Sequence, residues 1–411
     1  MINEHFRNSL RTAARLTRAG QLQQATAAIQ RALHGDGPVP PTADQPNTGS
    51  SKAQSPAPDN ILEGVFESLD PASTADTSTP DHKHWNPEAL LQKLGQLLHR
   101  QPSPLTPAAP IAPGARFLSL THSSAAGSRE YKLYIPSHYQ DGEQNWPLLI
   151  MLHGCQQNPD DFAAGSRMNQ LAEEFRCLVA YPAQTGSANH FKCWNWFQPA
   201  DQQRGQGEPA ILASLTRELI TKYGLNPKQV FIAGLSAGGA MAAVMGANYP
   251  ELFAAVGVHS GLACGAAQDL PSALLAMRQG SSTQHTLQQS ALPALIVFHG
   301  EKDNTVNPVN SDQLIAQWKT QWKDQEPSAA TAPETAISNG QVPGGHAYTR
   351  QQIRDNNGNL RLEYWQVHGA DHAWAGGSAA GSFTDPRGPD ASRAMLQFFY
   401  QQSDGPPSAR E

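Results

Sequence analysis

Apolar residues change their distribution near residue 114. Earlier positions carry few of them, whereas later positions alternate short apolar runs with amphipathic segments. The runs 147–152 and 294–299 are continuous, as expected for strands buried on both faces. Residues 208–223 instead place their apolar side chains on one helical face. Strands that alternate with helices predict an α/β domain over 114–403, with a mostly parallel, doubly wound sheet.

Further elements of this domain follow from the same two periodicities. Apolar runs predict strands at 131–135, 177–181, 230–233, 253–258 and 360–367, and helical spacing predicts helices at 237–249 and 392–400. Residues 325–346 show neither pattern, and we expect a low-complexity loop there.

The first 113 residues have a different character. Apolar residues spaced among Arg, Gln and Ala predict a helical segment over 1–35. Residues 36–113 are rich in Pro, Ser and Thr, a composition that buries too little apolar surface to order itself, so we expect a disordered linker with short helices. The N-terminus lacks the apolar region and cleavage site of a secretory signal, which favours a cytoplasmic location.

Composition argues against several classes of function. The 411-residue chain has a formal net charge of −6, which gives no reason to expect nucleic acid as a partner. No stretch is long and apolar enough to suggest a transmembrane segment, and no phosphate-binding glycine pattern or zinc-type cysteine pair indicates a cofactor. Buried thiols are the favoured interpretation of the few, dispersed cysteines, with one bridge left open. They are Cys155, Cys177, Cys193 and Cys264.

Residues 234–238 form a G-x-S-x-G pentapeptide centred on Ser236. It follows a predicted strand and begins a predicted helix, the context in which such a serine is a nucleophile. The glycines are expected because side chains beside this sharp turn would clash with neighbouring backbone. A tight turn without chemistry is the alternative, and the residues that follow in the sequence favour the nucleophile.

A serine nucleophile needs a base, and the base needs an orienting acid; in this kind of fold the chain order is serine, acid, histidine. Asp303 follows the predicted strand 294–299, at the edge of the sheet where ligands bind. We predict that Asp303 is the acid, with Glu301 as its nearest rival. A simple turn-forming aspartate is the alternative for this position.

His372 is the predicted base. It lies on a glycine-flanked loop after the predicted strand 360–367, whereas its rival His368 lies nearer that strand, where a structural role is more common. Together with Asp371, these histidines also suggest a metal site. A zinc site usually needs a third protein ligand that other groups hold in place. The nearby sequence offers no such ligand, so no metal is predicted.

The negative oxygen of a tetrahedral intermediate needs two backbone N–H donors. One belongs to the residue after the nucleophile, here Ala237, and the other to a loop after an earlier strand. The sequence HGC at 153–155 follows the predicted strand 147–152, so Cys155 is the predicted second donor. Cys155 as a nucleophile is the alternative, but it has no obvious basic partner in the sequence.

Four aromatic residues crowd the segment 190–197, HFKCWNWF. In a loop they favour the wall of an apolar pocket, and packing beneath the loop is an equal alternative for each of them. Glu208 begins the next predicted helix, and complementing the N-terminus of that helix is a sufficient interpretation of its carboxylate.

Together these segments resemble the poly(3-hydroxybutyrate) depolymerase family of esterases, a group that also contains feruloyl-esterase-like enzymes. The matching text is MLHGCQQ, CWNWF, RGQGEPA, VFIAGLSAGGAMAAVMGANYPELFAAV, HGEKDNTVNP and GADHAWAGG. The resemblance implies an α/β-hydrolase fold that hydrolyses carboxylic esters through an acyl-enzyme. It implies that Ser236, Asp303 and His372 are nucleophile, acid and base, and that Trp194 contacts substrate. We expect further substrate contacts from His153, Trp196 and Trp374.

We therefore expect serine-dependent hydrolysis of 3-hydroxybutyrate oligomers or polyester, without a cofactor. A feruloyl or acetyl esterase acting on small plant-derived esters is the alternative. A third hypothesis treats the domain as a non-catalytic scaffold at a granule surface. Whether the domain is an esterase or a scaffold, we expect residues 1–35 to be the segment that associates with granules.

Overall fold

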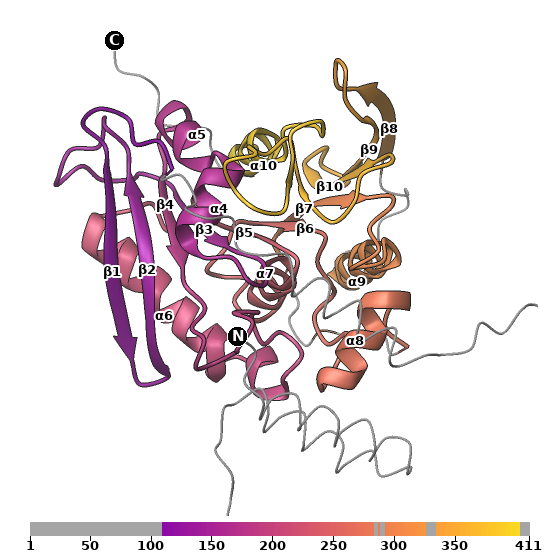
Figure 1. The fold of residues 1–411 in the computed structure, drawn as a ribbon, viewed down its shortest axis with the longest axis horizontal. Helices are drawn as coiled ribbons and strands as arrows, with labels where there is room; N and C mark the ends of the chain where they lie inside the picture. Colours follow the sequence, from indigo (N-terminus) through magenta and orange to yellow (C-terminus); the bar gives the residue numbers. More distant parts are fainter. Residues whose placement is uncertain (1–108, 283–286, 288–291, 326–333, 403–411) are drawn as a thin grey trace, which may run out of the picture. The chain divides into compact units, whose positions relative to one another are not determined.

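The computed structural model describes residues 109–282, 287, 292–325 and 334–402. Figure 1 draws the other residues as a thin grey trace. The predicted helical segment 1–35 lies outside the described residues, as does nearly all of the predicted linker 36–113. Their organisation stays a prediction, and so do the boundaries 114 and 403 of the predicted catalytic domain.

Ten strands of the described residues form one sheet, in the order β1-β2-β4-β3-β5-β6-β7-β10-β9-β8 (Figure 1). Its six central strands run parallel to one another, which confirms the predicted mostly parallel sheet. Five of the six are buried along their whole length, because helices cover both faces, and this explains their continuous apolar sequences. The six are β3 (Leu148–Leu152), β4 (Leu178–Pro182), β5 (Val230–Leu235), β6 (Ala255–His259), β7 (Ala294–Gly300) and β10 (Leu360–Val367).

Antiparallel strands extend both ends of the sheet. β1 (Arg116–Ser124) and β2 (Gly127–Ile135) form a hairpin beside β4, whereas β9 (Ala347–Arg354) and β8 (Glu334–Gln341) continue from β10. The prediction of a loop over 325–346 is therefore wrong for the residues that form β8. Nearly every side chain of β8 is exposed, so no apolar pattern marks this strand, and the backbone ladder to β9 holds it in place.

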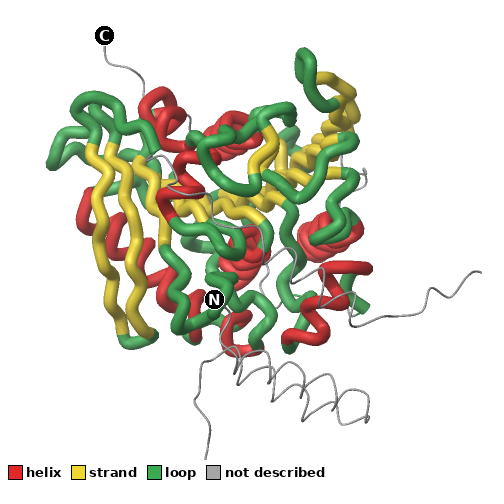
Figure 2. The backbone as a smooth tube through the Cα atoms, in the orientation of Figure 1, coloured by secondary structure: helices red, strands yellow, loops and turns green. Residues whose placement is uncertain are grey.

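Helices lie on both faces of the sheet, as predicted for a doubly wound fold (Figure 2). One buried cluster includes residues of four helices and the other includes residues of three. The first four are α6 (Gly207–Tyr223), α7 (Ala237–Asn248), α8 (Leu270–Gln279) and α9 (Val309–Gln325), and the other three are α4 (Pro159–Ser166), α5 (Met168–Phe175) and α10 (Ala391–Tyr400). No helix of the described residues has the length and apolarity needed to cross a membrane.

The carboxyl ends of β3, β5, β6, β7 and β10 lie next to one another because these strands are parallel neighbours in the sheet. Ser236 directly follows β5, Asp303 follows β7, and His372 follows β10. This edge is where ligands bind in open α/β sheets. The fold therefore gathers residues that are far apart in the sequence at one edge of the sheet.

Candidate active site

Ser236 occupies a sharp turn between β5 and α7. Its backbone has φ 56° and ψ −119°, a strained conformation typical of a nucleophile that is presented above the edge of a sheet. The Ser236 N–H donates to the carbonyl oxygen of His259, at the end of β6, at a distance of 2.8 Å. A Cβ added to Gly238 would lie 2.1 Å from the carbonyl oxygen of Leu152. The expectation that glycine avoids a backbone clash beside this turn is confirmed.

Asp303 and His372 lie within hydrogen-bonding distance. His372 Nδ1 is 2.7 Å from Asp303 Oδ2, and Asp303 Oδ1 accepts the N–H groups of Thr305 at 2.9 Å and Val306 at 2.8 Å. A second imidazole, that of His299, has its Nε2 3.3 Å from Asp303 Oδ2. Burial alone would raise the pKa of Asp303, but the two imidazoles and their hydrogen bonds hold it well below its usual range. A fixed, charged carboxylate is what an orienting acid requires.

The two rivals for acid and base have other partners. Glu301 accepts the backbone N–H of Gly369 at 3.0 Å. His368 Nδ1 lies 3.5 Å from Glu301, and its Nε2 lies 2.9 Å from the Thr349 hydroxyl. Glu301 and His368 therefore connect the loop after β7 with the loop after β10, and so support the loop that carries His372.

His259 is a buried histidine between the serine turn and the His372 loop. Its carbonyl oxygen holds the Ser236 N–H, and its Nε2 accepts the N–H of Ala375 at 3.0 Å, three residues after His372. Its ring stacks on Trp374 with the centroids 5.1 Å apart. Burial, aided by nearby histidines, lowers the pKa of His259 to about 3. The ring is therefore neutral, as an acceptor nitrogen must be.

Cys155 and Ala237 carry the two predicted oxyanion donors. Cys155 lies in the loop after β3, which we call the oxyanion loop (153–157), and Ala237 is the first residue of α7. The neighbouring Gly154 N–H is already bound by Gln157 Oε1 at 2.8 Å. The N–H groups of Cys155 and Ala237 have no acceptor within the described residues. Both are thus available for an oxyanion, and their role stays a prediction.

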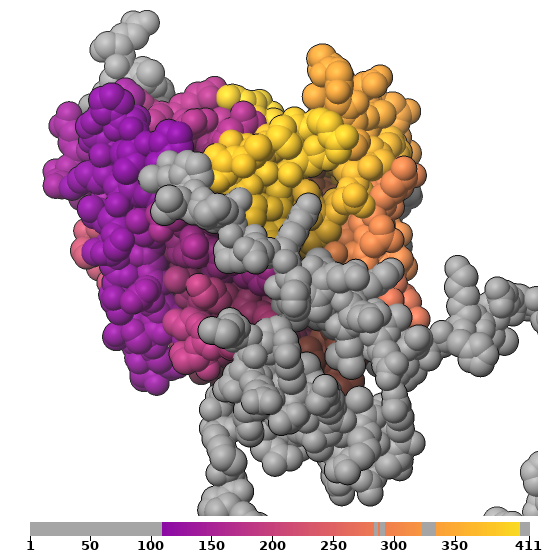
Figure 3. Space-filling model, viewed as in Figure 1, coloured from indigo at the N-terminus to yellow at the C-terminus, as the bar shows by residue number. Residues whose placement is uncertain are grey.

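Gln157 connects the oxyanion loop to the C-terminal part of the domain. Its Nε2 donates to Asp161 Oδ2 at 2.9 Å and to the carbonyl oxygen of Ser382 at 3.0 Å. Asp161 also accepts the Ser382 N–H at 2.9 Å. Nearby, β11 (Trp374–Ala375) pairs with β12 (Thr384–Asp385) and closes the segment that follows His372. In the space-filling view the yellow C-terminal residues lie against earlier, magenta residues (Figure 3).

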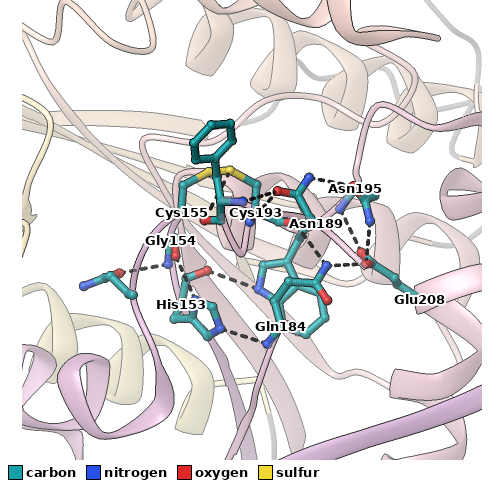
Figure 4. Close-up of a disulfide and its surroundings, with 11 residues drawn as sticks. His153, Gly154, Cys155, Gln184, Asn189, Cys193, Asn195 and Glu208 are labelled. Carbon is teal, nitrogen blue, oxygen red and sulfur yellow. Dashed lines mark hydrogen bonds between the residues drawn. A yellow bond between two sulfur atoms is a disulfide. The ribbon is translucent and has the colours of Figure 1, made fainter. Parts of the chain in front are cut away.

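Cys155 and Cys193 form a disulfide, which corrects the favoured interpretation of buried thiols for these two residues. They are 38 residues apart in the sequence, and only the folded loops bring them together. Cys177 and Cys264 are buried free thiols, as expected. The bridge joins the oxyanion loop to the aromatic segment 190–197 (Figure 4).

The four residues predicted to contact substrate are at most 4% exposed. The indole N–H of Trp194 donates to the His153 carbonyl oxygen at 3.1 Å, and His153 Nε2 accepts the Gln184 N–H at 3.0 Å. Trp374 donates its indole N–H to Ser392 Oγ at 3.0 Å. Rings this deeply buried leave almost no surface for a ligand in this structure, and substrate contact by these residues stays a prediction. Packing beneath the loop, the alternative considered for the aromatic segment, describes its two tryptophans better.

Sequence analysis missed several residues that hold the site together. The expectation for Glu208, that it complements a helix N-terminus, covers only part of its role, because its carboxylate also accepts hydrogen bonds from Gln184 and Asn195. One available signal was His299, an imidazole inside the apolar run ALIVFHG, since a buried polar ring needs partners. The residues missed are Gln157, Asp161, Gln184, Asn195, His259 and His299.

Comparison with known proteins finds a family that part of the chain resembles. Residues 129–331 match the family described as Esterase PHB depolymerase. The matched residues make up just under half of the chain and are similar to this family of esterases. The match confirms the resemblance found in the sequence, and its boundaries include the Ser236 turn, the oxyanion loop and Asp303. His372 lies beyond the matched residues.

Individual relatives carry several ester-hydrolase names. Poly(3-hydroxyalkanoate) depolymerase C of Paucimonas lemoignei is 31% identical over 212 residues, which cover 49% of this chain and 51% of that protein. Feruloyl esterase B of Neurospora crassa is 29% identical over 190 residues, which cover 42% of this chain and 63% of that protein. The chain thus spans about half to two thirds of the length of these relatives.

The solved structure of an acetyl xylan esterase from Aspergillus awamori is similar in fold. The TM-score is 0.51 at 21% sequence identity, and the alignment covers 69% of this chain and 99% of that chain. This similarity supports the α/β-hydrolase fold expected from the sequence.

The substitution His259→Gln tests the buried neutral acceptor. The pKa of His259 is about 3 in the folded chain, against about 6.5 when unfolded. Its contribution to stability is therefore complete above pH 6.5 and is lost as the pH falls from 6.5 towards 3. The loss amounts to about 1.4 kcal/mol of unfolding free energy per pH unit. In urea titrations between pH 4 and 7, the variant should lose stability less steeply than the wild type by that amount, and parallel curves would contradict the assignment.

The double substitution Cys155→Ala/Cys193→Ala tests the disulfide. A bridge across 38 residues is expected to contribute about 3–4 kcal/mol to the free energy of unfolding. Urea denaturation should show this loss in the double variant. A thiol reductant should shift the wild type towards the variant and leave the variant unchanged. A wild type that unfolds identically with and without reductant would show that the bridge is absent.

Proposed function

We propose that the protein hydrolyses carboxylic esters through an acyl-enzyme formed on Ser236. The observation that carries this proposal is the hydrogen bond between His372 and a buried, charged Asp303, at the same sheet edge as the strained Ser236 turn. His259 supports it, because this one residue is hydrogen-bonded to Ser236 and to Ala375 in the loop of His372. The similarity of residues 129–331 to an esterase family gives independent support.

In the proposed reaction the Ser236 hydroxyl attacks the ester carbonyl while His372 accepts its proton. The carbonyl oxygen becomes an oxyanion, which the N–H groups of Cys155 and Ala237 stabilise. His372 then gives the proton to the departing alkoxide, leaving the acyl group on the serine. Water repeats the sequence with His372 as base, so the acid leaves and the serine regains its proton. Asp303 keeps the imidazole oriented and stabilises its charged form.

We infer that the natural ester is a 3-hydroxybutyrate oligomer or polyester. The family description and the depolymerase named among the relatives favour this substrate class. A feruloyl or acetyl esterase is the second candidate, because relatives and a fold neighbour bear those names. A scaffold without activity is the weakest reading, since it leaves the His372–Asp303 pair and the strained serine without a purpose.

A substrate panel measured with the wild type and Ser236→Ala tests the proposal. The panel contains a p-nitrophenyl acyl series, a 3-hydroxybutyrate oligomer, methyl ferulate and acetylated xylan. Wild-type turnover is expected on the acyl series and the oligomer, and Ser236→Ala should lower kcat by roughly 10⁴- to 10⁶-fold. A higher kcat/KM on methyl ferulate or acetylated xylan than on the oligomer would favour the second candidate. A folded wild type that hydrolyses none of these esters would leave only the scaffold.

We further propose that residues 1–35 associate with polyester granules, on the strength of their amphipathic spacing in the sequence. Deleting these residues should lower the fraction of protein that sediments with poly(3-hydroxybutyrate) particles, while kcat on a soluble p-nitrophenyl ester stays the same. Unchanged sedimentation would exclude this role. The cytoplasmic location expected from the N-terminus stays a prediction, and the Cys155–Cys193 bridge counts against it, because disulfides persist mainly in oxidising compartments.

A further inference from the structure

Glu208 is a buried carboxylate that the proposed reaction does not use. It is the second residue of α6 and is 3% exposed. Two charged side chains of the described residues face it from other elements. Arg129 on β2 has its Nη2 3.3 Å from Glu208 Oε1, and Asp201 in η1 (Pro199–Gln202) accepts the Glu208 backbone N–H at 2.7 Å. Arg129 acts on both carboxylates, so neither has a cation of its own.

The other partners of this carboxylate belong to the loop that precedes α6 (Figure 4). Asn195 donates its backbone N–H to Oε2 at 2.8 Å and its side-chain amide to Oε1 at 2.9 Å, and Gln184 Nε2 also donates to Oε1. A carboxylate that served only its own helix would bind the free N–H groups of that helix. The Glu208 carboxylate instead joins the two ends of the segment 184–195.

The segment 184–195 is in turn attached to the oxyanion loop on both sides of Cys155. The links are the disulfide from Cys193 to Cys155, the Gln156 N–H to the Phe191 carbonyl at 2.7 Å, the Gln184 N–H to His153 Nε2 at 3.0 Å, and the Trp194 indole N–H to the His153 carbonyl at 3.1 Å. Gln184 Nε2 also reaches the carbonyl oxygen of Cys193 at 3.0 Å. One loop partner of Glu208, Gln184, thus binds the oxyanion loop directly. The other, Asn195, directly follows Trp194, which also binds that loop.

We propose that Glu208 is a positioning residue for the oxyanion hole, which as a carboxylate orders the segment 184–195 and thereby fixes the Cys155 N–H. The inference rests on the proposed esterase function and adds to it a residue that does not touch the reacting atoms. An oxyanion develops only on the way to the tetrahedral intermediate. A displaced Cys155 N–H should therefore lower kcat much more than it raises KM.

The charged form of Glu208 is required because all of its side-chain partners are N–H donors. Protonation would place an O–H where an N–H already points, and at least one donor would lose its acceptor. Burial, together with the charge of Asp201, raises the pKa of Glu208 to about 7, against the opposing influence of the loop amides and Arg129. The oxyanion hole is therefore expected to loosen as the pH falls through 7.

The substitution Glu208→Gln tests this role, because it keeps the size of the side chain and sets an amide NH₂ against the donors. On a p-nitrophenyl ester at pH 8.5, kcat should fall about 10- to 100-fold, up to the loss of one oxyanion donor, with KM changed less than about threefold. Below the optimum, the wild-type log(kcat/KM) should first fall with a slope clearly above 1, since neutral His372 and charged Glu208 are lost together, and should return to a slope of about 1 once Glu208 is protonated and its contribution of about 10- to 100-fold is gone. The variant, which has only His372 to protonate, should approach a slope of about 1.

Glu363→Gln is the matched control. Glu363 on β10 is 2% exposed, and its carboxylate accepts hydrogen bonds from three side chains, those of Arg350, Gln352 and Trp365. This substitution should lower the thermal midpoint while leaving kcat and the wild-type slope unchanged. It therefore separates the loss of a buried carboxylate from the loss of this particular one.

The proposal is overturned if Glu208→Gln keeps the wild-type kcat or loses no more of it than Glu363→Gln does. It is also overturned if the log(kcat/KM) of Glu208→Gln falls with pH as steeply as that of the wild type. Should Glu208→Gln fail to fold, the wild-type profile decides alone: a stretch steeper than 1 that returns to a slope of about 1 at lower pH supports the role, and a slope of about 1 throughout overturns it. Ser236→Ala, assayed beside them, keeps the two hypotheses distinct. If that variant retains turnover, the proposed function fails whatever Glu208 does.

Discussion

The hydrogen bond from the Ser236 N–H to the His259 carbonyl oxygen ties a strained turn to the neighbouring strand, and the rest of the site depends on it. A φ of 56° at a non-glycine residue persists only where surrounding structure holds it. The His259 ring also accepts the Ala375 N–H, so one buried residue sets the serine turn and the His372 loop together. That ring can accept only while neutral, and its burial keeps it so. The dry interior, rather than a charge pair, therefore maintains this connection.

Two buried carboxylates flank the candidate site and have opposite surroundings. Asp303 lies between two imidazoles and accepts two backbone N–H groups, and its pKa falls well below the usual range. Glu208 has neutral amides for most of its partners and competes with Asp201 for one arginine, and its pKa rises to about 7. Asp303 thus stays charged over the whole working range of an enzyme. Of these two carboxylates, only Glu208 therefore changes its charge near neutral pH.

The sequence predicts what is determined locally or by order along the chain. The apolar runs identify the central strands, and the pentapeptide around Ser236 identifies the turn, because strand, glycine and helix are contiguous there. Pairings between distant loops have no such signature. The Cys155–Cys193 bridge depends on the meeting of two loops, and β8 is held by backbone bonds that leave no apolar pattern. An aromatic loop residue such as Trp194 has the same sequence signature in a pocket wall as in the core.

The two halves of the candidate site are built on different supports. His372 is held near strand ends, by Asp303 and by the contact between Glu301 and the backbone after β10. The Cys155 N–H is held instead by loops: one side of the oxyanion loop is attached to the segment 184–195 and the other, through Gln157, to the C-terminal segment. Strand ends are fixed by the whole sheet, whereas a loop is only as rigid as its few cross-links. In the proposed mechanism, the oxyanion side is therefore the side whose cross-links depend on the charge of Glu208 and on the disulfide, whereas the base and its acid are held by the ends of the strands.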